Sequence, residues 1–206
     1  QVWLDTLRTS TAPLSIEIGA GTFGGFSCNG KNNISLKGSG PGVTILKKGG
    51  VDGTIEADNC VNFNVQDITV VVSGETFGVR WSRGGSSRWT NVTIEPDGLS
   101  RSLSAWYEDT VDGCADSNKP IHYWFNSRLR GGNWGYVAFC SESWFFGSEI
   151  MATGKSYLPP NGKAALLVSG QVNGLAITAK PEVHVYGSVI RVQAEAGQGY
   201  VTPSTT

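Results

Sequence analysis

The stretch Lys31–Gly49, KNNISLKGSGPGVTILKKG, contains two short apolar runs separated by a glycine-rich corner. In the first run apolar residues alternate with polar ones, and the second run is rich in Val, Ile and Leu. Both patterns are typical of short strands. About 25 residues later, the segment NFNVQDITVVVSGE repeats the order of strand, turn and strand. The repeat predicts a chain that turns sharply after each short strand and then returns to the same place.

The turn-and-strand unit recurs along most of the chain. Aligned on their central apolar residues, the units lie 25, 24, 37, 21 and 39 residues apart. Intervals of about 20 to 25 residues, with one insertion and one doubled interval, are typical of a solenoid interrupted by loops. An aromatic residue precedes most of the units by a few positions, which predicts a second column. The central residues are Val43, Ile68, Val92, Leu129, Ile150 and Val189, and the aromatic ones are Phe63, Trp89, Phe125, Phe145 and Tyr186.

The alternation in these runs also predicts the core. We expect most of the following residues to be buried: Ile34, Val43, Ile45, Phe63, Val65, Ile68, Val70, Val92, Ile94, Leu129, Phe145, Ile150, Val189 and Ile190. Helical periodicity is convincing only from Val2 to Arg8, where Val2, Trp3, Leu4 and Leu7 would share one face.

Composition limits the classes of function. With 206 residues, 39% of them hydrophobic, the chain can form one domain with a substantial core. A net charge of −1 predicts no electrostatic attraction to nucleic acid. No apolar run approaches the roughly 20 residues that span a bilayer, so we expect no membrane partner. The first residue is Gln1, which indicates a processed form or an excised domain.

The four cysteines allow two disulfides, in three connectivities, if the compartment is oxidising. None has the CxxC spacing of a zinc or redox site, and small core or turn residues are the alternative. Cys28 and Cys60 each follow a polar turn and precede a strand, so they are candidates for stacking in neighbouring coils.

The segment Trp3–Lys47, WLDTLRTSTAPLSIEIGAGTFGGFSCNGKNNISLKGSGPGVTILK, resembles the start of many pectin-lyase-like domains. These are right-handed parallel β-helices, as in pectate lyases, pectin methylesterases and bacteriophage tailspikes. The resemblance implies an all-β fold: a single right-handed parallel β-helix solenoid over residues 1–206. It also implies a short N-terminal helix that caps the open end of the first coil. Within this domain the break in the repeat predicts a loop insertion at about 97–120, and we expect a C-terminal tail at about 196–206.

The resemblance transfers no catalytic residue. Pectin methylesterases are similar over the whole length in the order of their strands, and their activity needs two aspartates, an arginine and glutamines. This chain has Val79, Arg80 and Trp81 where a glutamine-containing strand is expected, and WFFGSE where an aspartate should open a strand. The calcium-binding aspartates and the basic arginine of pectate lyases also have no clear counterpart. The motif therefore specifies a fold and not a chemistry.

The largest departure from the repeat is the segment 95–125, EPDGLSRSLSAWYEDTVDGCADSNKPIHYWF. Loops inserted into solenoids often carry the functional site. Trp106 and Tyr107 could stack on sugar rings, while Glu108 and Asp109 could act as acid and base in glycoside cleavage. His122, where the segment returns to the coil, is the third catalytic candidate. A solvated acidic loop is the plain alternative.

Calcium is the one cofactor that the acidic segment suggests. Asp109, Asp112 and Asp116 offer oxygen ligands, but the D-x-D-x-D-G order of an EF-hand loop is absent. We expect no other metal or cofactor.

Arginines define a second candidate surface. Arg128 and Arg130, with Trp134 and Tyr136, follow the acidic segment, and equivalent positions on successive coils stack about 4.8 Å apart. Such a stripe, extended by Arg80, Arg83, Arg88 and Trp81, could hold the carboxylates of an acidic polysaccharide. The alternative is that these arginines pair with Glu56, Glu95 or Glu142 on the outer wall.

Three classes of function remain. The first is a glycan-recognising module of an extracellular or virion-surface protein, similar to a tailspike or adhesin; resemblance to tailspikes also implies a homotrimer. The second is a polysaccharide-degrading enzyme on the same fold, whether lyase, glycoside hydrolase or esterase. The third is a structural spacer.

Overall fold

The computed structural model describes residues 12–49, 52–74, 76–98, 102–109, 119–153, 164–169, 171–172, 175–176 and 180–193. These residues form strands and turns, with no helix among them. The helix expected at Val2 to Arg8 and the tail expected at about 196–206 lie outside the described residues.

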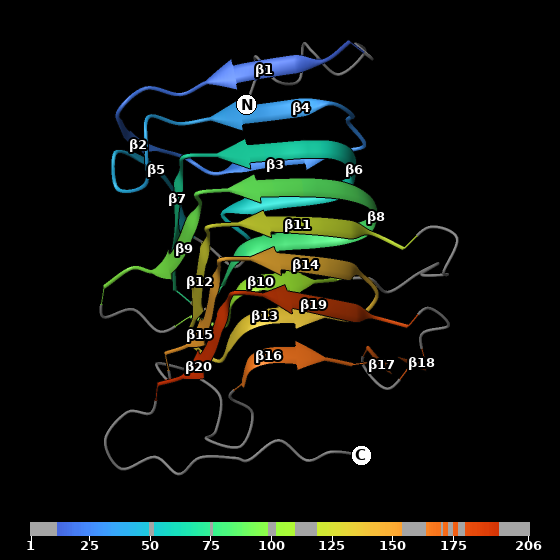
Figure 1. Cartoon of the computed structure of the whole chain (residues 1–206). Coiled ribbons are helices and arrows are strands. Elements are labelled where there is room, and N and C mark those ends of the chain that lie inside the picture. The colour runs from blue at the N-terminus through green and yellow to red at the C-terminus, as the bar shows by residue number, and fades with distance from the viewer. Residues whose placement is uncertain are drawn as a thin grey trace.

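The strands stack into a parallel β-helix with three walls (Figure 1). Successive coils contribute strands to each wall, and every described pairing is parallel except that of the short strands β17 (Gln171–Val172) and β18 (Leu175–Ala176). Wall 1 contains β1 (Leu14–Glu17), β4 (Ile34–Lys37), β11 (Ile121–Phe125), β14 (Glu142–Phe146) and β19 (Glu182–Tyr186). Wall 2 contains β2 (Gly21–Phe23), β5 (Thr44–Gly49), β7 (Thr69–Ser73), β9 (Thr93–Pro96), β12 (Arg128–Gly131), β15 (Glu149–Ala152) and β20 (Val189–Val192). Wall 3 contains β3 (Phe26–Asn29), β10 (Ser104–Glu108), β13 (Trp134–Ala138) and β16 (Ala164–Val168).

Two long strands, β6 (Ile55–Gln66) and β8 (Phe77–Thr90), belong to two walls. Their first halves pair within wall 3 and their second halves within wall 1. The chain bends between the halves, where Gly85 has a φ of +108°. A Cβ at Gly85 would lie 2.1 Å from the carbonyl oxygen of Cys60, so only glycine fits this corner.

The sharp turn from wall 1 to wall 2 uses one left-handed residue per coil. Five residues that stack in successive coils have φ between 48° and 58°, and all are Asp, Asn or Gly, the types that adopt this region most readily. The side chain of Asn91 also donates a hydrogen bond of 2.6 Å to Asp67. The five residues are Asp67, Asn91, Asn126, Gly147 and Gly187.

A serine follows this left-handed residue in three coils and points inward. The backbone N–H of Ser127 donates to the Ser148 hydroxyl at 3.2 Å, and that of Ser148 donates to Ser188 at 2.9 Å. Each hydroxyl donates in turn to a carbonyl of its own coil. The ladder satisfies polar backbone groups at a buried corner, which keeps the turn identical from coil to coil.

The interior of the helix is dominated by aromatic rings. From wall 1, Trp89 stacks on Trp124 with ring centroids 4.9 Å apart, and from wall 3, Trp106 stacks on Tyr136 at 5.5 Å. Trp106 also meets Trp89 and Trp124 edge-on, at 5.6 and 5.1 Å. All four rings are 0% exposed, so the two walls interlock through mixed stacked and edge contacts that favour one packing.

The expected core is confirmed for most of its members. Ten of the residues named above are buried: Ile34, Phe63, Val65, Ile68, Val70, Val92, Ile94, Leu129, Phe145 and Ile150. Ile45 is half-buried, because the neighbouring Leu46 takes the inward position in β5.

Three members of the expected core are exposed. Val43 precedes β5 and is 46% exposed, and Val189 pairs with Glu149 in an outward column and is 47% exposed. Ile190 has the inward register, but β20 is the last described strand of wall 2, and Ile190 is 45% exposed.

A disulfide joins Cys28 of β3 to Cys60 of β6, which confirms that these cysteines stack in neighbouring coils. Cys140 is also disulfide-bonded. The part of the chain that the structure describes has no helix long and apolar enough to cross a membrane.

Candidate functional site

The segment expected to be an inserted loop contains a strand of wall 3. Ser104–Glu108 forms β10, between β8 and β13, and Trp106 pairs with Val79 and Tyr136 at an inward position. The expectation that Trp106 and Tyr136 face a ligand is therefore wrong, because both rings are 0% exposed. Tyr107 points outward and stacks on Phe77 at 4.4 Å.

Glu108 also points inward, where it holds a corner of the fold. One carboxylate oxygen, Oε2, accepts hydrogen bonds from the backbone N–H groups of Phe139, Cys140 and Ser141, at 2.7, 2.9 and 3.2 Å. These residues connect β13 to β14. Burial raises the pKa of the Glu108 carboxyl, while the three N–H donors, which favour the ionised form, act in the opposite direction.

His122 lies beside Glu108, and both side chains are 0% exposed. Its Nδ1 is 2.8 Å from the hydroxyl of Ser87, which accepts a 2.7 Å hydrogen bond from the indole of Trp89. The Ser87 hydroxyl can then donate its own proton to Nδ1 of His122. Nδ1 is therefore the acceptor, and the neutral ring carries its proton on Nε2, which lies 3.8 Å from Oε1 of Glu108. Burial lowers the pKa of His122 to about 3. The pair is enclosed by aromatic rings, and a substrate cannot contact it in this conformation.

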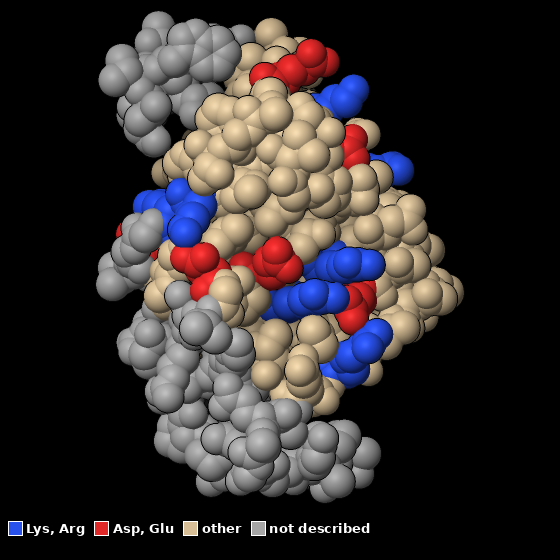
Figure 2. All heavy atoms as spheres, turned by 90° about the vertical axis from the view of Figure 1, so that its left-hand side faces the viewer, with Lys and Arg blue, Asp and Glu red and all other residues tan. Residues whose placement is uncertain are grey.

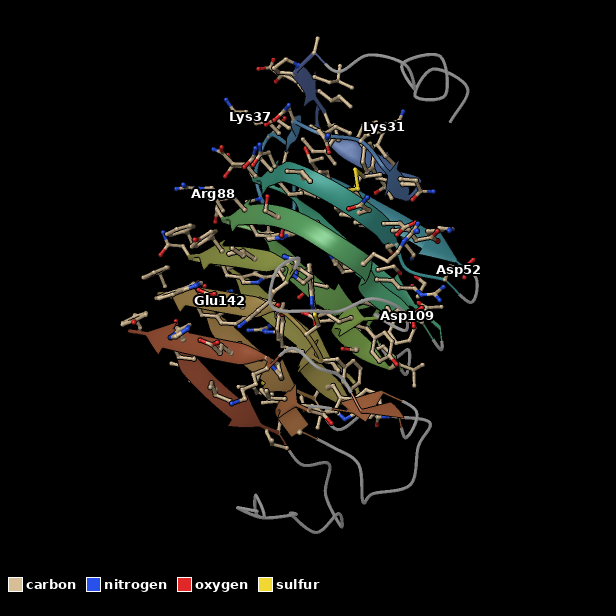
Figure 3. The ribbon with its side chains drawn as sticks, turned by 90° about the vertical axis from the view of Figure 1, so that its right-hand side faces the viewer. Lys31, Lys37, Asp52, Arg88, Asp109 and Glu142 are labelled. Carbon is tan, nitrogen blue, oxygen red and sulfur yellow. A yellow bond between two sulfur atoms is a disulfide. The ribbon has the colours of Figure 1, made fainter. Side chains whose placement is uncertain are left out.

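Asp109, which follows Glu108 in the chain, points outward into a shallow groove of about 440 Å³ on wall 3. Arg80 donates to Asp109 through Nε at 2.9 Å and through a second guanidinium nitrogen. The same groove is lined by Glu56 and by an ion pair between Arg83 and Asp58. Figure 3 shows Asp109 on the opposite side of the ribbon from Arg88 and Glu142.

Arg128 and Arg130 lie on a different wall from Asp109. They project from β12 on the outside of wall 2, where Arg130 is 2.9 Å and Arg128 is 4.0 Å from the carboxylate of Glu149. Arg191 of β20, which sequence reasoning missed, reaches the same carboxylate at 3.0 Å. Figure 2 shows basic and acidic side chains close together on this face. The structure therefore separates the arginines from the rest of the predicted site.

Trp134, the remaining predicted residue, is half-buried at the start of β13. It packs against the cluster formed by Val137 and Phe139, together with Tyr107. This ring lies on the side of wall 3 and does not extend the arginine surface.

The calcium hypothesis rests on Asp109, Asp112 and Asp116, of which the last two lie outside the described residues. Within the described parts of the chain, no three His, Cys, Asp or Glu side chains gather as a metal would require.

The outside of wall 1 carries an aromatic surface that sequence reasoning did not predict. Three consecutive strands, β11, β14 and β19, each place two rings outward, in two columns that run along the helix axis. In one column Phe125 stacks on Phe146 at 5.0 Å, and Phe146 on Tyr186 at 5.2 Å. We call this surface the aromatic platform; its residues are Tyr123, Phe125, Trp144, Phe146, His184 and Tyr186.

The platform rings are held in place by one another. In the second column Trp144 stacks on His184 with centroids 3.8 Å apart, and the indole N–H donates to Glu142 at 2.7 Å. Tyr123 and Tyr186 remain 39% and 50% exposed. Large exposed apolar side chains gathered in one patch indicate an interaction surface, whereas isolated ones need no explanation.

The two edges of the platform carry different charged side chains. Glu142 and Glu182 lie at the edge where β14 and β19 begin, and Lys119 forms a 2.7 Å ion pair with Glu182 there. At the opposite edge the strands end in the left-handed corner, beyond which lie Arg128 and Arg191 on wall 2. Arg88 of β8 covers the first coil of the platform, with its guanidinium carbon 4.4 Å from the centre of the Phe125 ring.

The platform has a sequence signal that could have revealed it. The segments YWF, WFF and HVY place aromatic side chains two residues apart in strands that occupy equivalent coils. Only the register decides which member of each segment points inward. Trp124 pairs with Phe145 and faces the core, so Phe125, a member of the predicted aromatic column, faces outward.

Comparison with known proteins identifies the fold. No protein-family model matches the sequence, and no curated protein matches it. Among solved structures, a pectin methylesterase mutant in complex with a hexasaccharide is 13% identical, with a TM-score of 0.52 over 88% of this chain and 60% of that one. A pectin methylesterase from Aspergillus niger, in deglycosylated form, is 14% identical, with a TM-score of 0.38 over 98% and 85% of the two chains.

The first of these similarities confirms the expected right-handed parallel β-helix. The chain spans about 60% of the length of that structure. At 13% identity the likeness concerns the fold alone, and the chemistry has to be argued from the side chains of this chain.

Proposed function

We propose that this chain is a glycan-binding β-helix module whose ligand lies on the aromatic platform. The observation that carries the proposal is the arrangement of six outward rings on three adjacent strands. Strands in one wall lie about 4.8 Å apart, so the platform extends about 10 Å along the helix axis. Sugars present apolar ring faces that stack on aromatic side chains, with hydroxyl groups left for polar neighbours.

Polar groups at the platform suit this ligand. The Glu142 carboxylate and the exposed Tyr123 and Tyr186 hydroxyls offer acceptors and donors for sugar hydroxyls. Rigid rings that are already stacked lose little conformational entropy on binding, which favours affinity at a shallow surface. The walls themselves are fixed by continuous parallel ladders, so no rearrangement of the backbone is needed.

The proposal also includes an extracellular location. Cys28 and Cys60 form a disulfide and Cys140 is disulfide-bonded. Disulfides persist in oxidising compartments and are uncommon in the cytosol. The proposal covers a secreted or surface-exposed module, and it does not extend to a virion or a homotrimer.

A glycan array followed by calorimetry with the best ligand tests the proposal. Tyr186→Ala removes a half-exposed platform ring, and we expect affinity to fall roughly tenfold, which corresponds to about 1.4 kcal/mol. Trp144→Ala should weaken binding at least as much. Phe23→Ala removes a ring that is 41% exposed on β2 and serves as the matched control. Unchanged affinity in both platform variants would refute the assignment.

Polysaccharide cleavage is the second candidate function, and the wall 3 groove is the observation that favours it. Of the three residues predicted to be catalytic, Asp109 alone reaches the surface, while Glu108 and His122 are buried. An ion pair with Arg80 holds the Asp109 carboxylate in place at the groove, where it could contact a bound sugar. A reducing-end assay on the parent and on Asp109→Asn tests this function. Turnover that Asp109→Asn leaves unchanged would exclude Asp109 from the chemistry.

A further inference from the structure

We infer that Arg128, Arg130 and Arg191 form a binding site for an anionic group, and that this site and the aromatic platform bind one anionic glycan across the corner between walls 1 and 2. The inference rests on the proposed function. It deepens that function by assigning the class of ligand, a glycan that carries carboxylates or sulfates.

The first argument is the balance of charge. Three guanidinium groups surround one carboxylate, that of Glu149, so this group of four side chains carries a net charge of +2. Glu95 stands beside Arg130 in the preceding coil, but it makes none of the ion pairs found in this cluster. Glu149 is only 15% exposed, whereas Arg128 and Arg191 are 63% and 56% exposed. Most of their N–H donors are therefore directed to solvent.

The second argument is an exposed guanidinium group that is not hydrogen-bonded to Glu149. Arg128 is 4.0 Å from Glu149, which is too long for a hydrogen bond. A carboxylate or sulfate accepts two or more N–H bonds from guanidinium groups and fits donors arranged in this way.

The third argument is the shape of the surface. A shallow hollow of about 480 Å³ extends from the three arginines to the corner residues Asn126, Gly147 and Gly187. Two of the three coils have glycine here, so in these two coils no side chain separates the hollow from the platform. Phe125 and Arg128 lie three residues apart on either side of the corner. One ligand can therefore stack on a ring of the platform and place its charged group among the arginines.

The arginines orient the ligand. They carry an excess of positive charge beyond the ends of the platform strands, whereas at the start of these strands Glu182 is paired with Lys119 at 2.7 Å and Glu142 accepts a hydrogen bond from Trp144. The sugar is therefore expected to lie with its anionic substituent toward wall 2.

Calorimetry with three oligosaccharides tests the inference. The probes are a linear uronic-acid hexamer, the same hexamer with its carboxyl groups reduced to alcohols, and a neutral hexamer bearing sulfate esters. We expect at least one charged hexamer to bind roughly tenfold more tightly than the reduced one at low salt, with the difference shrinking as salt is added. The stronger charged probe identifies the anionic group. Equal affinity of all three probes would overturn the inference.

Variants locate the effect. Arg128→Gln/Arg191→Gln should abolish the preference for charge and leave binding of the reduced hexamer unchanged, and Arg83→Gln on wall 3 is the matched control. Glu149→Gln removes the competing carboxylate, so it should strengthen binding of the charged hexamer, whereas a purely structural role for the cluster predicts no gain. A charge preference that survives the double arginine substitution would overturn the location.

A separate measurement distinguishes failure of this inference from failure of the proposed function. Nuclear magnetic resonance of the arginine Nε–H groups during titration with inorganic sulfate reports on the anion site without any sugar. Shifts at Arg128 and Arg191, but not at Arg83, support the anion site even if no hexamer binds, in which case the platform assignment fails instead. Absence of shifts at Arg128 and Arg191 would refute the site.

Discussion

Acid should destabilise the protein through His122. This imidazole is 0% exposed, and burial lowers its pKa from 6.5 to about 3. Between these two values the unfolded chain binds a proton that the folded chain does not, so the free energy of unfolding falls as the pH decreases below 6.5. Each pH unit corresponds to about 1.4 kcal/mol, and the full interval to about 5 kcal/mol. That loss is comparable to the whole stability of a marginal domain.

Glu108 complicates a direct measurement because it faces His122 and its pKa is raised by burial. A raised carboxyl pKa has the opposite effect, since stability then decreases as the pH increases above the ordinary value. The stability of Glu108→Gln is therefore compared with that of Glu108→Gln/His122→Asn, because neither variant contains the titrating Glu108 carboxyl. Asn at this position keeps a hydrogen-bonding group near Ser87.

Urea denaturation at pH 7, 6, 5 and 4 measures the effect. Between pH 6.5 and 4, Glu108→Gln should lose about 3 kcal/mol of stability relative to the double variant. Adding Phe23→Ala, which removes an exposed ring of β2 and no titrating group, should leave that slope in place and serves as the control. A stability difference that stays constant over this pH range would refute the argument that His122 is buried and neutral.

Three further predictions concern stability. Glu108→Ala leaves three buried N–H groups without an acceptor, and we expect urea denaturation to show a loss of about 3 kcal/mol or more; a loss below about 1 kcal/mol would contradict this structural role. Cys28→Ser/Cys60→Ser opens a link between residues 32 apart, which should cost about 3–4 kcal/mol in the same assay under oxidising conditions, and equal stability would argue against the bond. Ile68→Asp places a charge in a position that is 0% exposed and should prevent folding, so a soluble variant with a cooperative melt would show that the inward column is wrongly assigned.

Local sequence predicted the repeat, because its causes are local. Short β-forming runs, with glycine and asparagine at left-handed corners, are visible in single segments such as Lys31–Gly49, and the spacing near 24 residues is visible when neighbouring units are compared. The order of strand, corner and strand follows from the backbone preferences of those residues. The stacking of Cys28 with Cys60 could be anticipated in the same way, since both occupy equivalent places in successive units.

The direction of several side chains was decided only by the tertiary structure. Side chains in a strand alternate between two faces, so a shift of one residue in register exchanges inside and outside. In β10 this exchange buries Trp106 and Glu108 and points the following residue, Asp109, outward, and in β11 it buries Trp124 and leaves Phe125 on the platform. Aromatic residues at adjacent positions look equivalent in the sequence, because either could fill the core.

The sequence also did not predict which residues far apart in the chain meet in the fold. Arg130, Glu149 and Arg191 meet because β12, β15 and β20 are neighbours in wall 2. The paired positions Glu149 of β15 and Val189 of β20 are 40 residues apart in the chain, and the segment between them includes strands of walls 1 and 3. The spacing of strands within one unit predicts that the chain forms coils. The long segments inserted between units hide which units become neighbours. The sequence by itself therefore determined a parallel solenoid, while the pairing of its walls decided where the aromatic and charged surfaces lie.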